Sequence, residues 1–213
     1  MDIMVENMFN PPDKMRLMFE AVSELIKEQK EISRITVAEI TSKAGIGKGT
    51  AYEYFSSKEE LIVNALMYEY CIKIQKLAKS AFEPEQFKDR VYKIMDWLMD
   101  NREYNQMFTA VINSVMGVPG HDFFNAHCCA NEFVIAAREY ILEMIDKFME
   151  YGYQKKAFTA ESKWKRSMAL MTAMVEYSFV ITNPKPVRRG EPDKISHKEV
   201  REFIYESLIK SLS

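Results

Sequence analysis

Hydrophobic positions along this chain recur every three to four residues, which is the period of amphipathic helices. Between Lys14 and Lys30, the residues Met15, Met18, Val22 and Leu25 form one apolar stripe. Similar periodicity predicts helices over residues 57–82, 85–100, 103–115, 122–152, 160–182 and 197–211. The pattern therefore predicts an all-α protein.

The composition agrees with this fold class and adds one unusual feature. Seven glycines and seven prolines in 213 residues leave few tight turns, which argues against a β-sandwich or barrel. Fifteen methionines and 12% aromatic residues supply large, adaptable apolar surface. The net charge of −2 gives no overall basic signature for nucleic acid.

Several cues predict a cytoplasmic protein without a membrane span, cofactor or metal. The opening residues MDIMVENMFN carry acids where a secretory signal needs bases, and no apolar run is long enough to cross a bilayer. Three cysteines, Cys71, Cys128 and Cys129, make an odd count typical of a reducing compartment. His121 and His127, with the adjacent Cys128 and Cys129, are the best metal candidates. The C-x₂-C spacing of structural zinc sites is absent, however, and two adjacent cysteines are more typical of packing. A metal-binding or thiol-sensing role for this group remains the alternative.

Residues 36–58 carry the most specific pattern. Thr36 and Glu39 have capping-box spacing before a short helix, and Gly45 follows where the chain must reverse. A second short helix over Lys48–Tyr54 precedes another capping box, Ser57 to Glu60, which opens the long helix. Two short helices joined by a glycine turn predict a helix-turn-helix, whose second helix can enter a major groove.

The local charge supports DNA contact at short range. Residues 43–58 contain three lysines, Lys43, Lys48 and Lys58, against Glu53 alone. Gly47, Lys48, Gly49 and Thr50 provide the small polar surface that such a helix needs. Hydroxyl groups and helix starts can also bind phosphates without changing the net charge.

This segment resembles the TetR family of transcriptional regulators. The resemblance rests on Ala44-Gly45, Lys48-Gly49-Thr50, Tyr52-Glu-Tyr-Phe55 and Ser57-Lys-Glu-Glu-Leu61, over about 26 residues. It implies phosphate contacts by Thr36, Tyr52 and Lys58, and base contacts by Gly47, Lys48, Thr50 and Tyr54. At Glu53-Tyr54 the family often has a basic residue and a histidine, so an acid here favours a cytosine amino group or lowers affinity.

The resemblance divides the chain into a DNA-binding domain, residues 1–58, and a ligand-binding and dimerisation domain, residues 59–213. It implies a homodimeric repressor, not an enzyme, that binds a palindromic operator and is released by a small apolar or amphipathic ligand. The predicted pocket consists of Trp97, Phe108, Tyr140, Met144, Met174 and Tyr177. The predicted dimer interface consists of Trp164, Met168, Met171, Val175, Val200, Ile204 and Leu208.

Two alternatives stay open. The interior could be fully packed, so that the regulator answers to a partner protein or to nothing. The chain could also be a small all-helical enzyme, although the sequence shows no catalytic motif.

Overall fold

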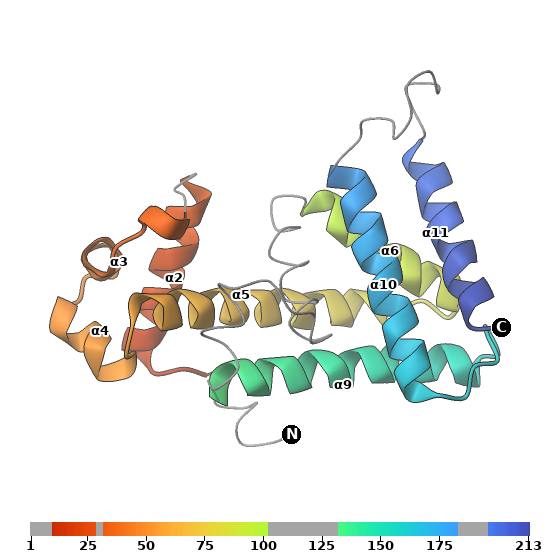
Figure 1. Ribbon diagram of the computed structural model, residues 1–213, viewed down its shortest axis with the longest axis horizontal. Coiled ribbons are helices and arrows are strands. Elements are labelled where there is room, and N and C mark those ends of the chain that lie inside the picture. The colour runs from red at the N-terminus through yellow and green to blue at the C-terminus, as the bar shows by residue number, and fades with distance from the viewer. Residues whose placement is uncertain (1–9, 29–31, 102–131, 183–195) are drawn as a thin grey trace. The chain divides into compact units, whose positions relative to one another are not determined.

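The computed structural model describes residues 10–28, 32–101, 132–182 and 196–213. Within these ranges all regular structure is helical, and no strand occurs, so the all-α prediction is confirmed. Figure 1 shows the helices in chain order. They are α2 (Asp13–Lys27), the 3₁₀ turn η1 (Ile32–Arg34), α3 (Val37–Lys43), α4 (Lys48–Tyr54), α5 (Lys58–Ala81), α6 (Phe87–Asp100), α9 (Glu132–Gln154), α10 (Lys163–Thr182) and α11 (His197–Ser211).

The sequence located most of these helices to within a few residues, and the 3₁₀ turn was not predicted. The helix predicted over residues 103–115, and the first part of the one predicted over 122–152, lie outside the described residues. Pro12 occupies the N-cap position of α2 and makes no side-chain cap. The carboxylate of Asp13, the first residue of α2, pairs with Arg16, 3.1 Å away.

Contacts divide the chain into two compact units. Unit 1 comprises residues 1–74 and 118–141, and unit 2 comprises residues 75–117 and 142–213. Both α5 and α9 therefore contribute residues to both units, and the division falls inside α5 rather than at its start.

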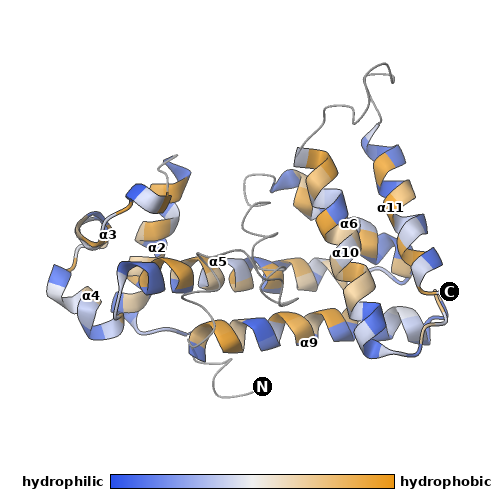
Figure 2. Ribbon diagram, viewed as in Figure 1, coloured by the Kyte–Doolittle hydropathy of each residue, from blue (hydrophilic) through white to orange (hydrophobic). Residues whose placement is uncertain are grey.

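Aromatic packing around Phe19 holds unit 1 together. The ring of Phe19 lies 6.0 Å from Phe55, 5.2 Å from Tyr68 and 5.9 Å from Phe133, measured between centroids. These partners come from the end of α4, from α5 and from α9, so α2 forms the centre of the unit. Figure 2 shows the matching pattern along α2, where hydrophobic and polar positions alternate around the helix.

Unit 2 contains α6, α10 and α11, which contact one another in all three pairs. Phe87 and Phe158 pack ring to ring at 5.4 Å, and Gly152 of α9 lies directly against both. A Cβ atom at residue 152 would come within 2.7 Å of either ring, so only glycine fits there. The chain end is fixed too, since the Thr159 and Ala160 amides donate to the Leu212 carbonyl at 3.1 and 2.8 Å.

Candidate nucleic-acid interface

The turn between α3 and α4 has the geometry that the sequence predicted. Gly45 has a φ of +67°, in the left-handed region that favours glycine. Its amide donates to the Ser42 carbonyl at 3.2 Å, and the Ile46 amide donates to the Thr41 carbonyl at 2.9 Å. This pair of bonds is a Schellman motif, which satisfies carbonyls at the end of α3 and redirects the chain into α4.

The second helix of the pair, α4, buries only one narrow side. Ala51 and Phe55 point into the core of unit 1, with exposed fractions of 2% and 3%. Lys48, Gly49, Tyr52 and Glu53 are exposed, and Thr50 and Tyr54 are half-buried. Figure 2 shows α4 in pale and blue colours, without the apolar stripe of its neighbours. Its outward surface is thus polar, with glycine among its positions.

Packing inside the protein does not require glycine on either side of Lys48, at Gly47 and Gly49. A Cβ atom added at Gly47 or Gly49 would meet no heavy atom within 4 Å. Gly47 is the N-cap of α4, with a φ of −73° that any residue can adopt. Because no side chain projects from these two positions, another molecule can approach the backbone of α4 closely there.

The other predicted DNA-contact residues differ in exposure and in the bonds that they already make within the protein. Lys48 is exposed and forms no ion pair with any described residue, and Tyr52 is 55% exposed. The Lys58 ammonium donates to the Ser33 carbonyl at 3.2 Å and lies 3.6 Å from the Glu59 carboxylate. Lys58 therefore also anchors the start of α5 to η1.

Thr36 and Lys43 serve local structure. The Thr36 hydroxyl accepts from the Glu39 amide and donates to the Glu39 carboxylate at 2.8 Å, which confirms the capping box. Lys43 pairs with Glu28 at 2.7 Å and with Glu24 at 3.4 Å, and the hydrogen bond to Glu28 raises its pKa. Lys43 was predicted as a DNA contact from its place in a lysine-rich segment, whereas its ion pairs depend on the packing of the end of α2 against α3.

The predicted pocket residues are distributed over both units. In unit 2, Met174 and Tyr177 are buried in α10, which packs against α6, while Trp97 and Met144 are half-buried. The Tyr177 hydroxyl is hydrogen-bonded to Nε2 of His197, and burial raises the Tyr177 pKa. Tyr140 belongs to the α9 segment of unit 1. Phe108 lies outside the described residues.

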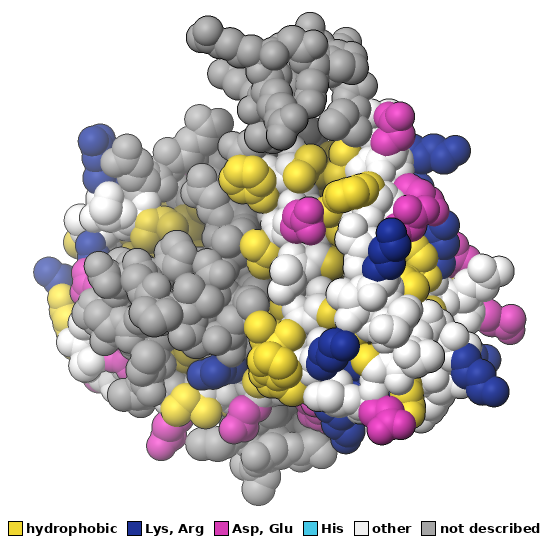
Figure 3. Space-filling view, turned by 45° about the vertical axis from the view of Figure 1, so that its right-hand side comes forward, with side chains coloured by type: hydrophobic (Ala, Val, Ile, Leu, Met, Phe, Trp, Pro, Cys, Tyr) yellow, Lys and Arg dark blue, Asp and Glu magenta, His cyan; other side chains and the backbone are white. Residues whose placement is uncertain are grey.

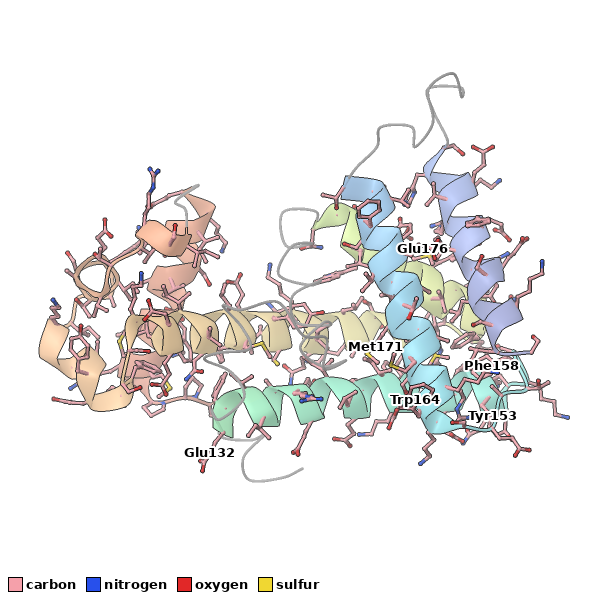
Figure 4. The ribbon with its side chains drawn as sticks, viewed as in Figure 1. Glu132, Tyr153, Phe158, Trp164, Met171 and Glu176 are labelled. Carbon is pink, nitrogen blue, oxygen red and sulfur yellow. The ribbon has the colours of Figure 1, made fainter. Side chains whose placement is uncertain are left out.

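The predicted dimer residues divide by face, and part of this prediction needs correction. Met171, Ile204 and Leu208 are at most 4% exposed, so their side chains fill the core of the protomer. Met168, Val175 and Val200 are half-buried, and Trp164 is 73% exposed. Figure 4 shows Trp164 at the first turn of α10 and Met171 about two turns further along.

Two further aromatic residues, outside the predicted interface, are also exposed. Phe179 of α10 is 65% exposed and Phe203 of α11 is 63% exposed. Phe179 continues the row of Trp164, Met168 and Val175 at intervals of four, seven and four residues. We call Trp164, Phe179 and Phe203 the exposed aromatic set. Figure 3 shows hydrophobic side chains at the surface of this side of the molecule, interrupted by charged groups.

Of the three cysteines, Cys71 lies in the part of the chain that the structure describes. Cys71 is buried, and burial raises the pKa of its thiol to about 12, so it stays protonated and packs as a small apolar side chain. His121, His127, Cys128 and Cys129 lie outside the described residues. Among the residues that are described, no group of three or more His, Cys, Asp or Glu could hold a metal ion. None of the helices in those ranges combines the length and apolar character needed to cross a membrane.

The helices α3 and α4, joined by the turn at Gly45 and with a polar outward face on α4, have the geometry of a helix-turn-helix, a motif of DNA-binding proteins. Comparison with known proteins agrees. Residues 24–65 match the family model of bacterial regulatory proteins of the tetR family. Residues 24–65 are therefore similar to the DNA-binding region of that family. None of the curated proteins matches the chain.

Solved structures extend the likeness over nearly the whole chain. The transcriptional regulator FadR from Bacillus subtilis, in complex with stearoyl-CoA, aligns with a TM-score of 0.53 and 15% identity, over 93% of this chain and 97% of that one. A TetR/AcrR-family regulator from Thermobifida fusca gives 0.52 and 19%, with the same coverage. The fatty acid degradation regulator FadR from Bacillus halodurans gives 0.52 and 17%, over 94% and 95%. The fold is thus that of TetR-family transcriptional regulators.

Proposed function

We propose that this protein is a homodimeric repressor that binds a palindromic operator through α4 and releases it when a small apolar or amphipathic ligand binds. The observation that carries the proposal is the outward surface of α4, which presents Lys48, Thr50 and Tyr52 around glycines that packing does not require. Such a surface suits the major groove, where side chains and backbone must approach base edges closely.

Dimerisation follows from the size of that surface and from unit 2. A seven-residue helix reaches few base pairs, so two copies reading two half-sites give usable specificity. The exposed aromatic set supplies the apolar surface that a second copy would cover. Met168, Val175 and Val200 are half-buried positions on the same two helices, and they stay in the proposed interface.

The DNA-binding part is tested by replacing Lys48 and Thr50 together with alanine. We expect the double variant to lose sequence-specific binding while its circular dichroism and its oligomeric state stay unchanged, because neither side chain is buried in the core. The Lys93→Ala variant, which removes one exposed lysine from α6, is the matched control and keeps full binding. Operator binding by the double variant at the wild-type affinity would contradict the assignment of α4.

The effector is proposed to be an apolar or amphipathic molecule. The methionine content supports this, since flexible thioether side chains can pack around varied apolar groups. The Bacillus subtilis regulator of the same fold was solved with stearoyl-CoA, which makes a long-chain acyl-CoA the first compound to test. Stearoyl-CoA should raise the unfolding temperature and release operator DNA, while coenzyme A alone should do neither.

The packing of unit 2 favours one competing function, a regulator with no effector cavity. Met95, Leu98, Met174 and Tyr177 are each at most 3% exposed, so these side chains of α6 and α10 are shielded from solvent, as expected where packing closes the interior. A regulator of this kind would bind its operator with the same affinity in the presence of every compound in a lipophilic library. Release by any one compound, with a saturable dose response, would exclude it.

A further inference from the structure

Glu53 lies on the outward face of α4. In a helix successive residues are about 100° apart, so Glu53 is roughly half a turn around from the midpoint of Ala51 and Phe55. Those two residues face the core of unit 1, and Glu53 is exposed. Its neighbours on the helix surface are Gly49, which has no side chain, and Thr50, whose side chain is short. The Glu53 side chain is therefore longer than those of Gly49 and Thr50 beside it.

This carboxylate has no task within the protein. Glu53 makes no hydrogen bond or ion pair with any described residue, whereas every other acidic side chain described between residues 10 and 60 has a partner. Asp13 and Glu20 pair with Arg16, Glu24 and Glu28 with Lys43, and Glu59 with Lys58, while Glu39 and Glu60 bond to Thr36 and Ser56.

An unpaired carboxylate on the outward face of a helix that enters the major groove has a narrow choice of partners. It is repelled by phosphates, and in the major groove by the acceptor atoms of guanine (O6 and N7) and thymine (O4). Adenine offers the N6 amino group beside the N7 acceptor, which suits an amide better than a carboxylate. Cytosine offers the N4 amino group with no acceptor next to it on that edge.

We propose that Glu53 sets the sequence specificity of this protein by accepting a hydrogen bond from the N4 amino group of a cytosine in each operator half-site. The proposal rests on the proposed function, because it requires α4 to lie in the major groove. The same charge disfavours binding to unrelated DNA, since phosphates and the acceptor atoms of guanine and thymine repel the carboxylate, and adenine sets its N7 acceptor beside its amino group. Glu53 thus acts by attraction at one base pair and by repulsion elsewhere.

The test selects binding sites from a random duplex library with the wild-type protein, Glu53→Gln and Glu53→Ala. The wild type should select a consensus with a cytosine at one symmetric position. The glutamine variant should select adenine there, because its amide can pair with N6 and N7 together. The alanine variant should accept any base at that position and keep the rest of the consensus.

Affinities on the selected operator then measure the contact directly. Replacing that C·G pair with T·A should weaken wild-type binding about tenfold and leave Glu53→Ala binding unchanged. Both variants should bind unrelated DNA more tightly than the wild type does. Glu132→Gln, which removes an exposed charge from α9 in the same unit, is the matched control and should change neither value.

The outcomes separate this proposal from the function on which it rests. If the wild type selects a consensus and both Glu53 variants select the same one, the role of Glu53 is overturned and operator binding stands. If the wild type selects no consensus, operator binding is overturned and the role of Glu53 falls with it. A shift confined to the cytosine position supports both.

Discussion

Single residues at the ends of α3 and α5 show how local chemistry sets the geometry of the DNA-binding unit. Thr36 and Glu39 satisfy each other and the free amides at the start of α3. At the start of α5, Ser57 accepts from the Glu60 amide at 3.1 Å, but the Glu60 carboxylate reaches back to the Ser56 amide at 2.7 Å. The predicted capping box is therefore present with its return bond displaced by one residue.

Gly45 and Gly49 should respond in opposite ways to replacement by alanine. Gly45→Ala forces a side chain into the left-handed region and should lower the free energy of unfolding by about 1 kcal/mol. Gly49→Ala lies inside a helix with open space around it, so it should stabilise the protein by about 0.5–1 kcal/mol. The added methyl on the outward face should nevertheless weaken operator binding.

Urea unfolding and operator titration of the two variants check this prediction. Equal changes in stability for the two would show that the turn imposes no conformational demand. Undiminished operator affinity of Gly49→Ala would show that DNA does not approach that face of α4.

Arg166 gives a second prediction at the residue scale. Its guanidinium is 3% exposed, bonds to Glu150 at 2.8 Å and stacks on Tyr153, while its Nε and Nη1 atoms have no hydrogen-bond partner. Glu150→Ala would leave a buried cation uncompensated and should cost about 2 kcal/mol. Arg166→Met removes the charge while filling the same space, so it should cost less. Denaturant unfolding of both variants measures the difference, and a larger loss for Arg166→Met would contradict the account.

At the scale of elements, α6 and α11 are joined by polar contacts as well as by apolar packing. Glu202 of α11 accepts hydrogen bonds from Lys88 and Tyr92 of α6. Arg201 pairs with Asp96 at 2.6 Å and lies over the Tyr92 ring at 4.2 Å. These groups are 105 to 114 residues apart in sequence, so they fix how α11 lies against α6.

This contact predicts a specific dependence of stability on pH. Hydrogen bonds from Lys88 and Tyr92 hold the pKa of Glu202 below its ordinary value of 4.5. A depressed folded-state pKa stabilises the protein above pH 4.5, and that contribution disappears as the pH falls through the folded-state pKa. Glu202→Gln should therefore unfold at a lower temperature than the wild type at pH 7, and the gap should close below pH 4.5.

Thermal unfolding between pH 3 and pH 7 measures this gap. Glu206→Gln is the matched control, because Glu206 is an exposed acid on the same helix, with no partner among the described residues. Its curve should follow that of the wild type throughout. A gap for Glu202→Gln that stays constant with pH would show that the carboxylate does not contribute as a charged group.

At the scale of the whole molecule, the proposed dimer depends on the exposed aromatic set. Replacing Trp164 and Phe179 with serine should weaken dimerisation tenfold or more, since aromatic residues in the centre of an interface each contribute roughly 2 kcal/mol or more. Operator affinity should fall as well, because two half-sites must be read together. Sedimentation equilibrium and circular dichroism check the assembly and the fold.

A control with the same chemistry lies on α9. Ile135 is 41% exposed in unit 1, so Ile135→Ser removes a comparable exposed apolar group elsewhere and should leave the assembly unchanged. A wild-type protein that sediments as a monomer at micromolar concentration would contradict the dimer. A double variant as dimeric as the wild type would place the interface elsewhere.

The sequence by itself determined the features that depend on neighbouring residues. Helix periodicity, the Thr36 cap and the glycine turn at Gly45 are local, because their hydrogen bonds join residues at most five apart. The DNA-binding segment is made of such features, which is why it could be found without a structure. The helix over residues 197–211 was placed on its exact bounds for the same reason.

Only the tertiary structure decided which apolar face turns inward and which charges are already paired. On α11 Phe203 and Ile204 are adjacent apolar residues, and packing against α6 and α10 buried Ile204 while leaving Phe203 exposed. Lys43 and Glu53 lie ten residues apart, and only folding shows that Lys43 is paired with α2 while Glu53 has no partner among the described residues. Contacts between distant segments leave no periodic trace in the sequence, so the free surface of this protein follows from its packing.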